Sequence, residues 1–310
     1  MDLTEIIKQY KPNVKDNTIK QYVIQLNRLK KIIEKDNFDF LKNFEMVEKT
    51  LSVKHFTTVR NFYNSIIVYL QAVNENDEII KKYVKARDDL NEQYQNSQTE
   101  TISEKQKKNF PTMDEFNKML DTMSKQIRSQ KIKTKGDLTG KEKELLMMYT
   151  IFNMLRYIPT RNDIAGMVLT TPKNYPKMDK DNNYLVMGPS QMYYMLNNFK
   201  TNKTYGKDKR IDVTPQTLVR TLRSYIRATG KKTGDVLFTT STGNPISRNV
   251  LSQMLMKTSK KYMDKSVSTT MMRKLVVSHE LKDFKKTQTD LADKMQHSVA
   301  TQNHIYIKEQ

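Results

Sequence analysis

The sequence contains no cysteine, and glycine and proline are scarce, with 8 of each among 310 residues. Without cysteine there can be no disulfide, no thiolate catalysis and no cysteine-ligated zinc. This composition fits a reducing, intracellular environment. The shortage of glycine and proline favours helices over a β-sandwich or a barrel. No apolar stretch reaches the roughly 18 to 20 residues that cross a bilayer. The N-terminal sequence MDLTEIIKQY shows no secretory signal, so no membrane partner is expected.

Acidic residues are also few in relation to basic ones. The chain has 34 aspartates and glutamates against 54 lysines and arginines, a formal charge of +20. An excess of this size has to be solvated or matched by an anionic partner. Nucleic acid is the commonest match, because each neutralised phosphate releases a condensed counterion. A basic protein without any polyanion partner is the alternative that the charge leaves open.

Apolar residues at helical spacing predict a small helical domain over residues 1–93. Its clearest apolar stripe is Ile19, Val23, Leu26, Leu29 and Ile33. Further helices are expected at about 57–73 and 77–94. Residues 94–110 contain almost no apolar side chains and are interpreted as a linker between domains. A surface loop within a single domain is the alternative for this stretch.

The remaining residues, 111–310, combine helices with a few strands. Strand-forming residues at 183–187, 193–199 and 210–213 are separated by Gly188-Pro189 and by the lysine-rich turn KTNKTYGKDK. They predict a small antiparallel sheet with an exposed basic hairpin. The expected helices are 113–127, 141–157, 215–229, 247–262, 269–280, 287–295 and 299–306. The fold class expected for the chain is therefore mainly α with a small antiparallel sheet.

If the anionic partner is DNA, cleavage of its backbone by a protein hydroxyl would need four kinds of group. These are a nucleophile, cations on the phosphate oxygens, a base for the nucleophile and an acid for the leaving 5′ oxygen. No HExxH pattern or carboxylate pair marks a metal site. The histidines are His55, His279, His297 and His304. Such a mechanism would have to rely on arginine and lysine.

The C-terminal segment LADKMQHSVATQNHIYIK resembles the end of the tyrosine recombinases. In that family a Leu-Gly-His-Ser motif is followed by a threonine and then by a nucleophilic tyrosine, nine positions after the histidine. His297, Ser298, Thr301 and Tyr306 keep this spacing.

Three upstream segments match the same family in the same order. YIPTRNDIAGMVL resembles its first arginine motif and assigns Arg161, while STTMMRKLVVSH resembles its His-x-x-Arg helix and assigns Arg273. The basic hairpin between two strands is where the family keeps a catalytic lysine, which matches Lys200 or Lys203. The resemblance covers about residues 110–306.

This resemblance implies a site-specific DNA recombinase or integrase that acts through a 3′-phosphotyrosyl intermediate. Tyr306 would attack the scissile phosphate. Arg161, Arg273 and His297 would stabilise the charge on its non-bridging oxygens, and one of the two hairpin lysines would protonate the leaving 5′ oxygen. Neither a metal nor ATP nor another cofactor is implied.

The resemblance also implies a domain organisation and partners. Residues 1–93 would be a DNA-clamping core-binding domain and 111–310 the catalytic domain, together forming a clamp around double-stranded DNA. A homotetramer on two DNA sites is implied, as is an intracellular, DNA-associated location, in the cytoplasm of a prokaryote or in the nucleus or viral factory of a eukaryotic host. A virus or a mobile element is a plausible source.

Two positions depart from the family pattern. Gln296 replaces the usual glycine before the histidine, and Thr270 stands where the family has histidine or lysine. A threonine hydroxyl can hydrogen-bond a phosphate but cannot act as a base near pH 7. Thr270 is therefore predicted as a phosphate contact, as are Lys207 and Lys209 in the basic hairpin.

Other interpretations remain beside this one. A type IB topoisomerase shares the catalytic core, although its small viral members begin with a β-rich domain. A catalytically silent DNA-binding protein is favoured by Thr270. Arg161 could instead cap a helix or pair with Asp163, and Tyr306 could be a packing residue. Tyr262 or Tyr225 would then be the tyrosines to test as nucleophiles.

Overall fold

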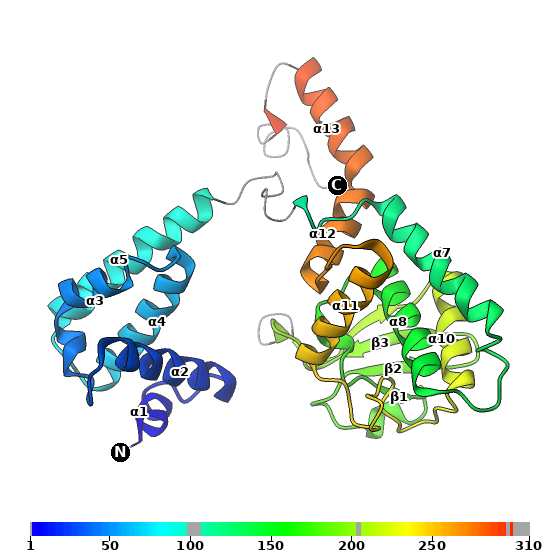
Figure 1. Cartoon of the computed structure of the whole chain (residues 1–310), viewed down its shortest axis with the longest axis horizontal. Helices are drawn as coiled ribbons and strands as arrows, with labels where there is room; N and C mark the ends of the chain where they lie inside the picture. The colour runs from blue at the N-terminus through cyan, green and yellow to red at the C-terminus, as the bar shows by residue number, and fades with distance from the viewer. Residues whose placement is uncertain (1, 98–106, 203–205, 296–297, 300–310) are drawn as a thin grey trace. The chain divides into compact units, whose positions relative to one another are not determined.

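The structure is a computed structural model that describes residues 2–97, 107–202, 206–295 and 298–299. The chain divides into two compact units, Met1–Ile102 and Ser103–Gln310 (Figure 1). None of the helices in the described ranges has the length and apolar character of a membrane span.

The described part of the first unit is entirely helical. Its elements are α1 (Leu3–Tyr10), α2 (Asp16–Ile33), the 3₁₀ turn η1 (Asp39–Lys42), α3 (Phe44–Leu51), α4 (Phe56–Ala72) and α5 (Asp77–Asn96). Helix α4 packs against α1, α2 and α5 and is the most deeply buried of them. The stripe expected on α2 faces this core through Ile19, Leu26 and Leu29. The hydroxyl of the buried Tyr83 donates to the Leu41 carbonyl oxygen at 2.9 Å, which fixes α5 against η1.

The stretch 94–110, interpreted as a linker, is helical at its start. Helix α5 continues to Asn96, so the first residues assigned to the linker are helical. Of the remainder, residues 98–106 lie outside the described part of the chain. The assignment of residues 1–93 and 111–310 as DNA-clamping and catalytic domains stays a prediction.

The second unit packs helices around a small sheet (Figure 1). Its helices are α7 (Met113–Ser129), α8 (Gly140–Tyr157), α10 (Gln216–Ala228), α11 (Arg248–Met263), α12 (Thr269–Glu280) and α13 (Lys282–Lys294), with 3₁₀ turns η2 (Asn162–Ile164) and η3 (Tyr175–Lys177). Its strands are β1 (Val168–Thr170), β2 (Tyr184–Met187), β3 (Met192–Leu196) and β4 (Lys209–Asp212). The chain is therefore mainly helical with one small sheet, as expected.

The sheet is mixed and not purely antiparallel. Strands β2, β3 and β4 correspond to the three expected segments and pair antiparallel, with Tyr194 opposite both Leu185 and Ile211. Strand β1 adds a parallel edge, with Val168 opposite Tyr184. The sequence did not reveal β1 because three residues are too short to show an alternating pattern.

Helix α8 organises the second unit. A capping box between Thr139 and Glu142 begins it, because each side chain accepts a hydrogen bond from the backbone of the other residue. Its buried residues pack against α7, α10 and α12. On α12, Met272 and Leu275 are buried in this core. The position of α12 is thus set by apolar packing on α8.

The C-terminal helix begins earlier than the sequence indicates. Helix α13 begins at Lys282 and not at residue 287, so that Leu281 alone separates it from α12. The stretch KDFKKT contains neither glycine nor proline and can continue as helix. The helix expected at 299–306 lies almost wholly outside the described residues.

Candidate active site

A buried carboxylate, Asp163, lies at the centre of the predicted site. It belongs to η2, in the connection between α8 and β1, and is 7% exposed. Burial raises the pKa of this carboxyl, and the guanidinium groups of Arg248, Arg161 and Arg273 oppose that rise, in this order. The guanidinium of Arg248 contacts this carboxylate, and those of Arg161 and Arg273 lie close enough to act on it electrostatically.

Arg161 is exposed and immediately precedes η2. Within the described parts of the chain, its guanidinium makes no hydrogen bond and no ion pair at contact distance. The ion pair to Asp163 comes instead from Arg248, whose Nη2 lies 3.3 Å from Oδ1. The guanidinium of Arg161 is consequently near the carboxylate without being its direct partner, and its planar donor fork can take an external anion.

Arg273 reaches the same loop from α12. Its Nε donates to the carbonyl oxygen of Pro159 at 3.1 Å, two residues before Arg161. The side chain is half-buried, between the buried residues Met272 and Leu275 of the helix. This single backbone contact orients the guanidinium and leaves the two terminal nitrogens without a hydrogen bond to any other described residue.

A network of asparagines joins the Arg161 loop to the base of the basic hairpin. The Nδ2 of Asn183 donates to the carbonyl oxygens of Asp163, at 2.8 Å, and of Asn198, at 2.9 Å. Its Oδ1 accepts from the backbone N–H groups of Asn197 and Asn198. The Oδ1 of Asn197 in turn accepts from the backbone N–H of Asp208 at 3.0 Å. The two ends of the basic hairpin between β3 and β4 are therefore both fixed to the loop that carries Arg161.

The hairpin lysines have different surroundings. Lys200 is exposed in the turn that follows β3, two residues after Asn198. Lys203 lies outside the described residues. Lys207 pairs with Asp181 at 2.9 Å, which raises its pKa. Lys209 is exposed on β4. Of the two candidate catalytic lysines, the structure describes only Lys200, which lies two residues after Asn198 of the asparagine network.

Thr270 is exposed in the first turn of α12. Its neighbour Thr269 donates a hydrogen bond through its hydroxyl to Oδ1 of Asn162, the residue after Arg161. The first turn of α12 is thereby tied to the Arg161 loop. The structure thus places Arg161, Thr270 and Arg273 around one loop and brings the hairpin with Lys200 to the same loop.

His297, Thr301, Tyr306 and Gln296 lie outside the described residues. The roles of His297 and Tyr306 therefore stay predictions. Two other tyrosines that could replace Tyr306 have engaged hydroxyls. Tyr225 is buried, which raises its pKa, and donates to the Leu237 carbonyl oxygen at 3.1 Å.

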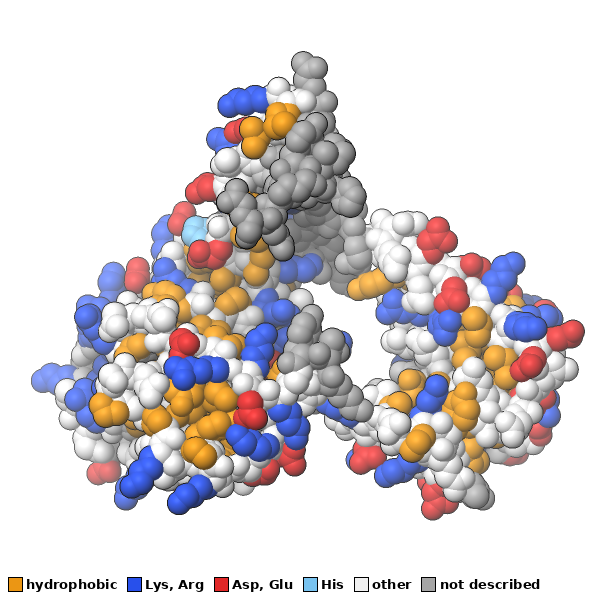
Figure 2. Space-filling model, turned by 180° about the vertical axis from the view of Figure 1, so that it is seen from behind, with side chains coloured by type: hydrophobic (Ala, Val, Ile, Leu, Met, Phe, Trp, Pro, Cys, Tyr) orange, Lys and Arg blue, Asp and Glu red, His pale blue; other side chains and the backbone are white. Residues whose placement is uncertain are grey.

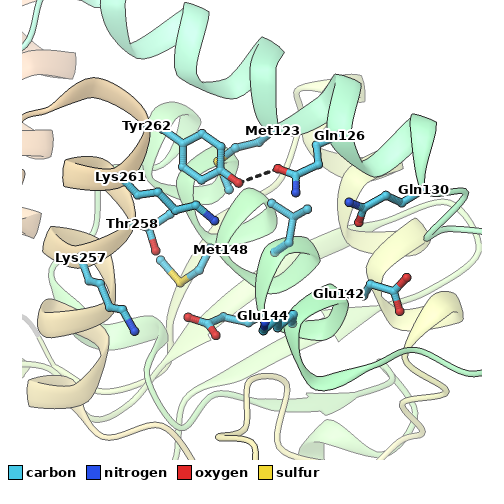
Figure 3. Close-up of a pocket in the computed structure, with 12 residues that line it drawn as sticks. Met123, Gln126, Gln130, Glu142, Glu144, Met148, Lys257, Thr258, Lys261 and Tyr262 are labelled. Atoms are coloured by element: carbon cyan, nitrogen blue, oxygen red, sulfur yellow. Dashed lines mark hydrogen bonds between the residues drawn. The ribbon is translucent and has the colours of Figure 1, made fainter.

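Tyr262 is the second of these tyrosines. Its hydroxyl donates to Oε1 of Gln126 at 2.7 Å, in a cavity of about 550 Å³ between α7, α8 and α11 (Figure 3). Met123 and Met148 are among the residues that line this cavity. None of the predicted catalytic residues that the structure describes lines this cavity. It is therefore separate from the arginine cluster, which consists of Arg161, Arg248 and Arg273.

Neither Arg248 nor the asparagines could be recognised as site residues from motifs in the sequence. Arg248 is the first residue of α11, where the positive end of the helix dipole disfavours a cation. An arginine at such a position is a weak signal for a nearby anion, and here the anion is Asp163. The pairs Asn182-Asn183 and Asn197-Asn198 flank the β2–β3 hairpin, but nothing in the sequence shows that they face each other.

The two units differ sharply in charge. Residues 1–102 contain 16 lysines and arginines against 15 aspartates and glutamates, whereas residues 103–310 contain 38 against 19. On the face seen in Figure 2, basic side chains dominate the second unit, while both signs are intermixed over the first. The excess positive charge of the chain therefore lies in the unit that contains the arginine cluster.

No protein-family model matches the sequence, and no curated protein matches it. Two of the solved structures that it matches align over nearly the whole chain. The crystal structure of XerA recombinase is 15% identical with a TM-score of 0.37, covering 99% of this chain and 94% of that one. The Tn1549 transposon integrase in complex with transposon right-end DNA is 15% identical with a TM-score of 0.44, covering 100% and 96%. Because both TM-scores are low, the candidate site is defined only by its own residues and contacts.

Proposed function

We propose that this chain is a site-specific DNA recombinase or integrase of the tyrosine recombinase type. It would cut and rejoin duplex DNA through a 3′-phosphotyrosyl intermediate. The observation that carries the proposal is that Arg273, from α12, contacts the loop that carries Arg161, although the two arginines lie far apart in the sequence. Both were assigned from sequence motifs alone.

The two arginines suit a phosphate that passes through a more highly charged transition state. A guanidinium stays charged and presents parallel donors that match two phosphate oxygens. Arg273 is held by its Nε, so its terminal nitrogens can point to the substrate. Donors fixed before the substrate arrives need little reorganisation when charge develops, and this makes electrostatic stabilisation effective.

The covalent step would use residues at the C-terminus of the chain. The phenol of Tyr306 gives up its proton to water, and its oxygen forms a bond to phosphorus as the bond to the 5′ oxygen breaks. That oxygen leaves with a proton from Lys200 or Lys203, while His297 donates a hydrogen bond to a non-bridging oxygen. A phenol has a pKa of about 10, and neighbouring cations would lower it towards the operating pH.

Double-stranded DNA is the proposed partner, because the second unit has twice as many basic as acidic residues. Residues 1–93 would clamp the DNA and 111–310 would cut it. The same proposal includes assembly as a homotetramer on two sites and action on the DNA of a mobile element or virus. It also includes a location with DNA inside the cell. The chemistry would use no metal or other cofactor.

The deciding experiment is a denaturing gel of protein bound to a labelled suicide duplex, in which the cleaved end diffuses away and the covalent adduct accumulates. The unmodified protein should form the adduct. Tyr306→Phe should bind the DNA but form none, because only the nucleophilic oxygen is removed. Tyr262→Phe is the matched control and should form the adduct as the unmodified protein does. An adduct with the Tyr306→Phe variant would show that another residue is the nucleophile.

A catalytically silent DNA-binding protein is the second candidate, and Thr270 favours it. Thr270 is exposed beside the Arg161 loop, so a histidine there has room to reach a bound phosphate. If the unmodified protein binds DNA without forming an adduct and Thr270→His restores adduct formation, the chain is a silenced relative. If both form it, Thr270→His should be the faster.

A type IB topoisomerase has less support. The first unit contains no strand in residues 2–97, whereas the small viral topoisomerases begin with a β-rich domain. Relaxation of supercoiled plasmid by the monomeric protein would nevertheless favour this activity over recombination.

A further inference from the structure

Arg248 connects three segments that are distant in the sequence. Its Nη2 lies 3.3 Å from Oδ1 of Asp163 and donates to the carbonyl oxygen of Asn198 at 2.7 Å. Its own carbonyl oxygen accepts from Nδ2 of Asn162 at 2.9 Å. The start of α11, the loop after Arg161 and the end of β3 therefore meet at one side chain.

The burial of the two partners is unequal. The side chain of Asp163 is 9% exposed and that of Arg248 is 47% exposed. A carboxylate so little solvated requires a cation or a proton. Arg248 contributes most to keeping it ionised, ahead of Arg161 and Arg273.

Asp163 therefore acts electrostatically on all three arginines, of which only Arg248 contacts it among the described residues. Among the described residues, while Arg248 contacts Asp163, the guanidinium of Arg161 makes no hydrogen bond or ion pair and that of Arg273 is bound only through Nε. If Arg248 were absent, Asp163 would attract one of the other two arginines or take up a proton. An arginine drawn to Asp163 would be withdrawn from an external phosphate.

The same side chain also affects the hairpin. Asn198, which accepts from Arg248, is held by Asn183, and Asn183 also donates to the backbone of Asp163. Lys200 follows Asn198 by two residues. A change at Arg248 would therefore loosen the turn that carries Lys200 as well as the loop that carries Arg161.

We propose that Arg248 is a positioning residue, which serves as the counterion of Asp163 so that Arg161 and Arg273 remain available for the substrate phosphate. This inference rests on the proposed function, because it assigns the phosphate to those two arginines. Arg248 itself does not contact the reacting atoms.

The first test measures adduct formation in single turnover on the suicide duplex, with DNA affinity measured on the same samples. Arg248→Met keeps most of the volume and removes the charge. It should slow adduct formation by about 100-fold, the typical effect of removing one electrostatic interaction. Asp163→Asn combined with Arg248→Met removes the competing carboxylate and should recover at least about tenfold of that loss. Arg248→Lys, which keeps a charge but not the planar fork, should be intermediate.

Arg220→Met is the matched control. Arg220 is exposed on α10 and makes no hydrogen bond or ion pair in the described structure. This variant should form the adduct at the unmodified rate. Thermal unfolding of every variant shows whether a slow rate reflects loss of fold, and Arg248→Lys and the double variant keep the test valid if Arg248→Met does not fold.

The second test uses DNA binding alone, and so it remains decisive if the unmodified protein forms no adduct. Arg161→Ala should weaken binding by about tenfold in the unmodified background, as expected when one cation is removed from a phosphate. In the Arg248→Met background the same change should have little effect, because Asp163 already withdraws Arg161. In the double variant with Asp163→Asn the effect should return.

The outcomes separate the two proposals. An unmodified protein that binds DNA without cleaving it contradicts the proposed function, while the binding cycle still decides the role of Arg248. The role of Arg248 is wrong if Arg161→Ala has the same effect in all three backgrounds, or if the Asp163→Asn double variant is no faster than Arg248→Met. It is also wrong if Arg248→Met weakens binding while the rate from the bound complex is unchanged, since Arg248 would then contact DNA directly.

Discussion

Residues 1–102 and 103–310 have nearly the same number of acidic residues, 15 and 19, but very different numbers of basic ones, 16 and 38. In the first unit many of the charges pair on the surface, as Lys82 does with Glu45 and Lys42 with Glu75. Exposed pairs of this kind contribute little to stability. Any attraction of the first unit to DNA must therefore come from a local face, since its charges nearly cancel.

The units also differ in what they bury. Among the described residues, the first unit has a single buried polar side chain, Ser65, whereas the second buries Asp163, Asn183 and Asn197, among others. A buried polar side chain costs free energy unless it is hydrogen-bonded, and a buried charge costs more. The first unit is thus held together mainly by apolar packing, with the hydroxyl of Tyr83 hydrogen-bonded to the Leu41 carbonyl oxygen. In the second unit, the buried polar side chains around the Arg161 loop cost free energy. A preorganised site would require buried polar groups at this place.

The comparison would break down if the two units were not separate bodies. We predict that limited proteolysis of the free protein cuts between residues 98 and 108, because this stretch is polar and lacks the apolar residues needed for packing. Mass spectrometry should then find two stable fragments. Cuts within α2 or α4 while 98–108 stays intact would contradict the division.

The charge difference predicts a steep dependence of DNA affinity on salt, arising mainly in the second unit. A protein that neutralises six to ten phosphates loses about 10³- to 10⁵-fold in affinity between 50 and 200 mM salt. Replacing Lys207 and Lys209 together by alanine should reduce the slope of log K against log salt by about one for each phosphate that is no longer neutralised.

The matched pair in the first unit is Lys20 and Lys31, both exposed on α2. Their replacement by alanine should change the slope less. An equal change from both pairs, measured by fluorescence anisotropy over a salt series, would mean that the first unit binds DNA through its local basic face despite its near-zero net charge.

Single arginines should separate binding from chemistry. Arg161→Ala and Arg273→Ala should each lower the rate of adduct formation by about 100- to 1000-fold, because each removes a fixed donor from the transition state. Arg28→Ala, an exposed arginine of α2, should leave the rate from the bound complex unchanged. Single-turnover kinetics at saturating protein measures this rate. Loss of rate in the Arg28 variant would move part of the chemistry to the first unit.

The smallest effect is the pH dependence of stability. Burial raises the pKa of Asp163 above its ordinary 3.8, so the folded chain binds this proton more tightly than the unfolded chain. Its contribution to stability is therefore complete below pH 3.8 and is lost as the pH rises through the raised pKa. Relative to Asp163→Asn, the protein should lose about 1.4 kcal/mol for each unit by which the pKa is raised.

Glu45 in the first unit should show the opposite trend. Lys82 lowers the pKa of this carboxyl below its ordinary 4.5, so its contribution is present above that pH and is lost as the pH falls. Urea unfolding of Asp163→Asn and Glu45→Gln beside the unmodified protein, between about pH 3 and 8, measures both. The same trend for both carboxylates would show that the burial of Asp163 does not govern its ionisation.

Much of the fold followed from local patterns. Alternation and turn residues marked β2, β3 and β4, and apolar periodicity marked the long helices, because these signals are repeated over several residues. Strand β1 was missed because it is three residues long and its partner β2 lies beyond η3. The start of α13 was placed late because only Leu281 interrupts the helices, with no glycine or proline to mark the end of α12.

The sequence by itself determined the helical character of the chain and the excess of positive charge. It also gave Arg161, Arg273 and either Lys200 or Lys203 as candidate site residues, because these depend on residue type and spacing. Only the tertiary structure decided that Arg273 contacts the loop that carries Arg161, that Arg248 and not the guanidinium of Arg161 pairs with Asp163, and that asparagines join this loop to the Lys200 hairpin. These contacts join segments as much as 114 residues apart. The packing of α8, α11 and α12 determines which residues meet in these contacts, and no local sequence pattern predicts that packing.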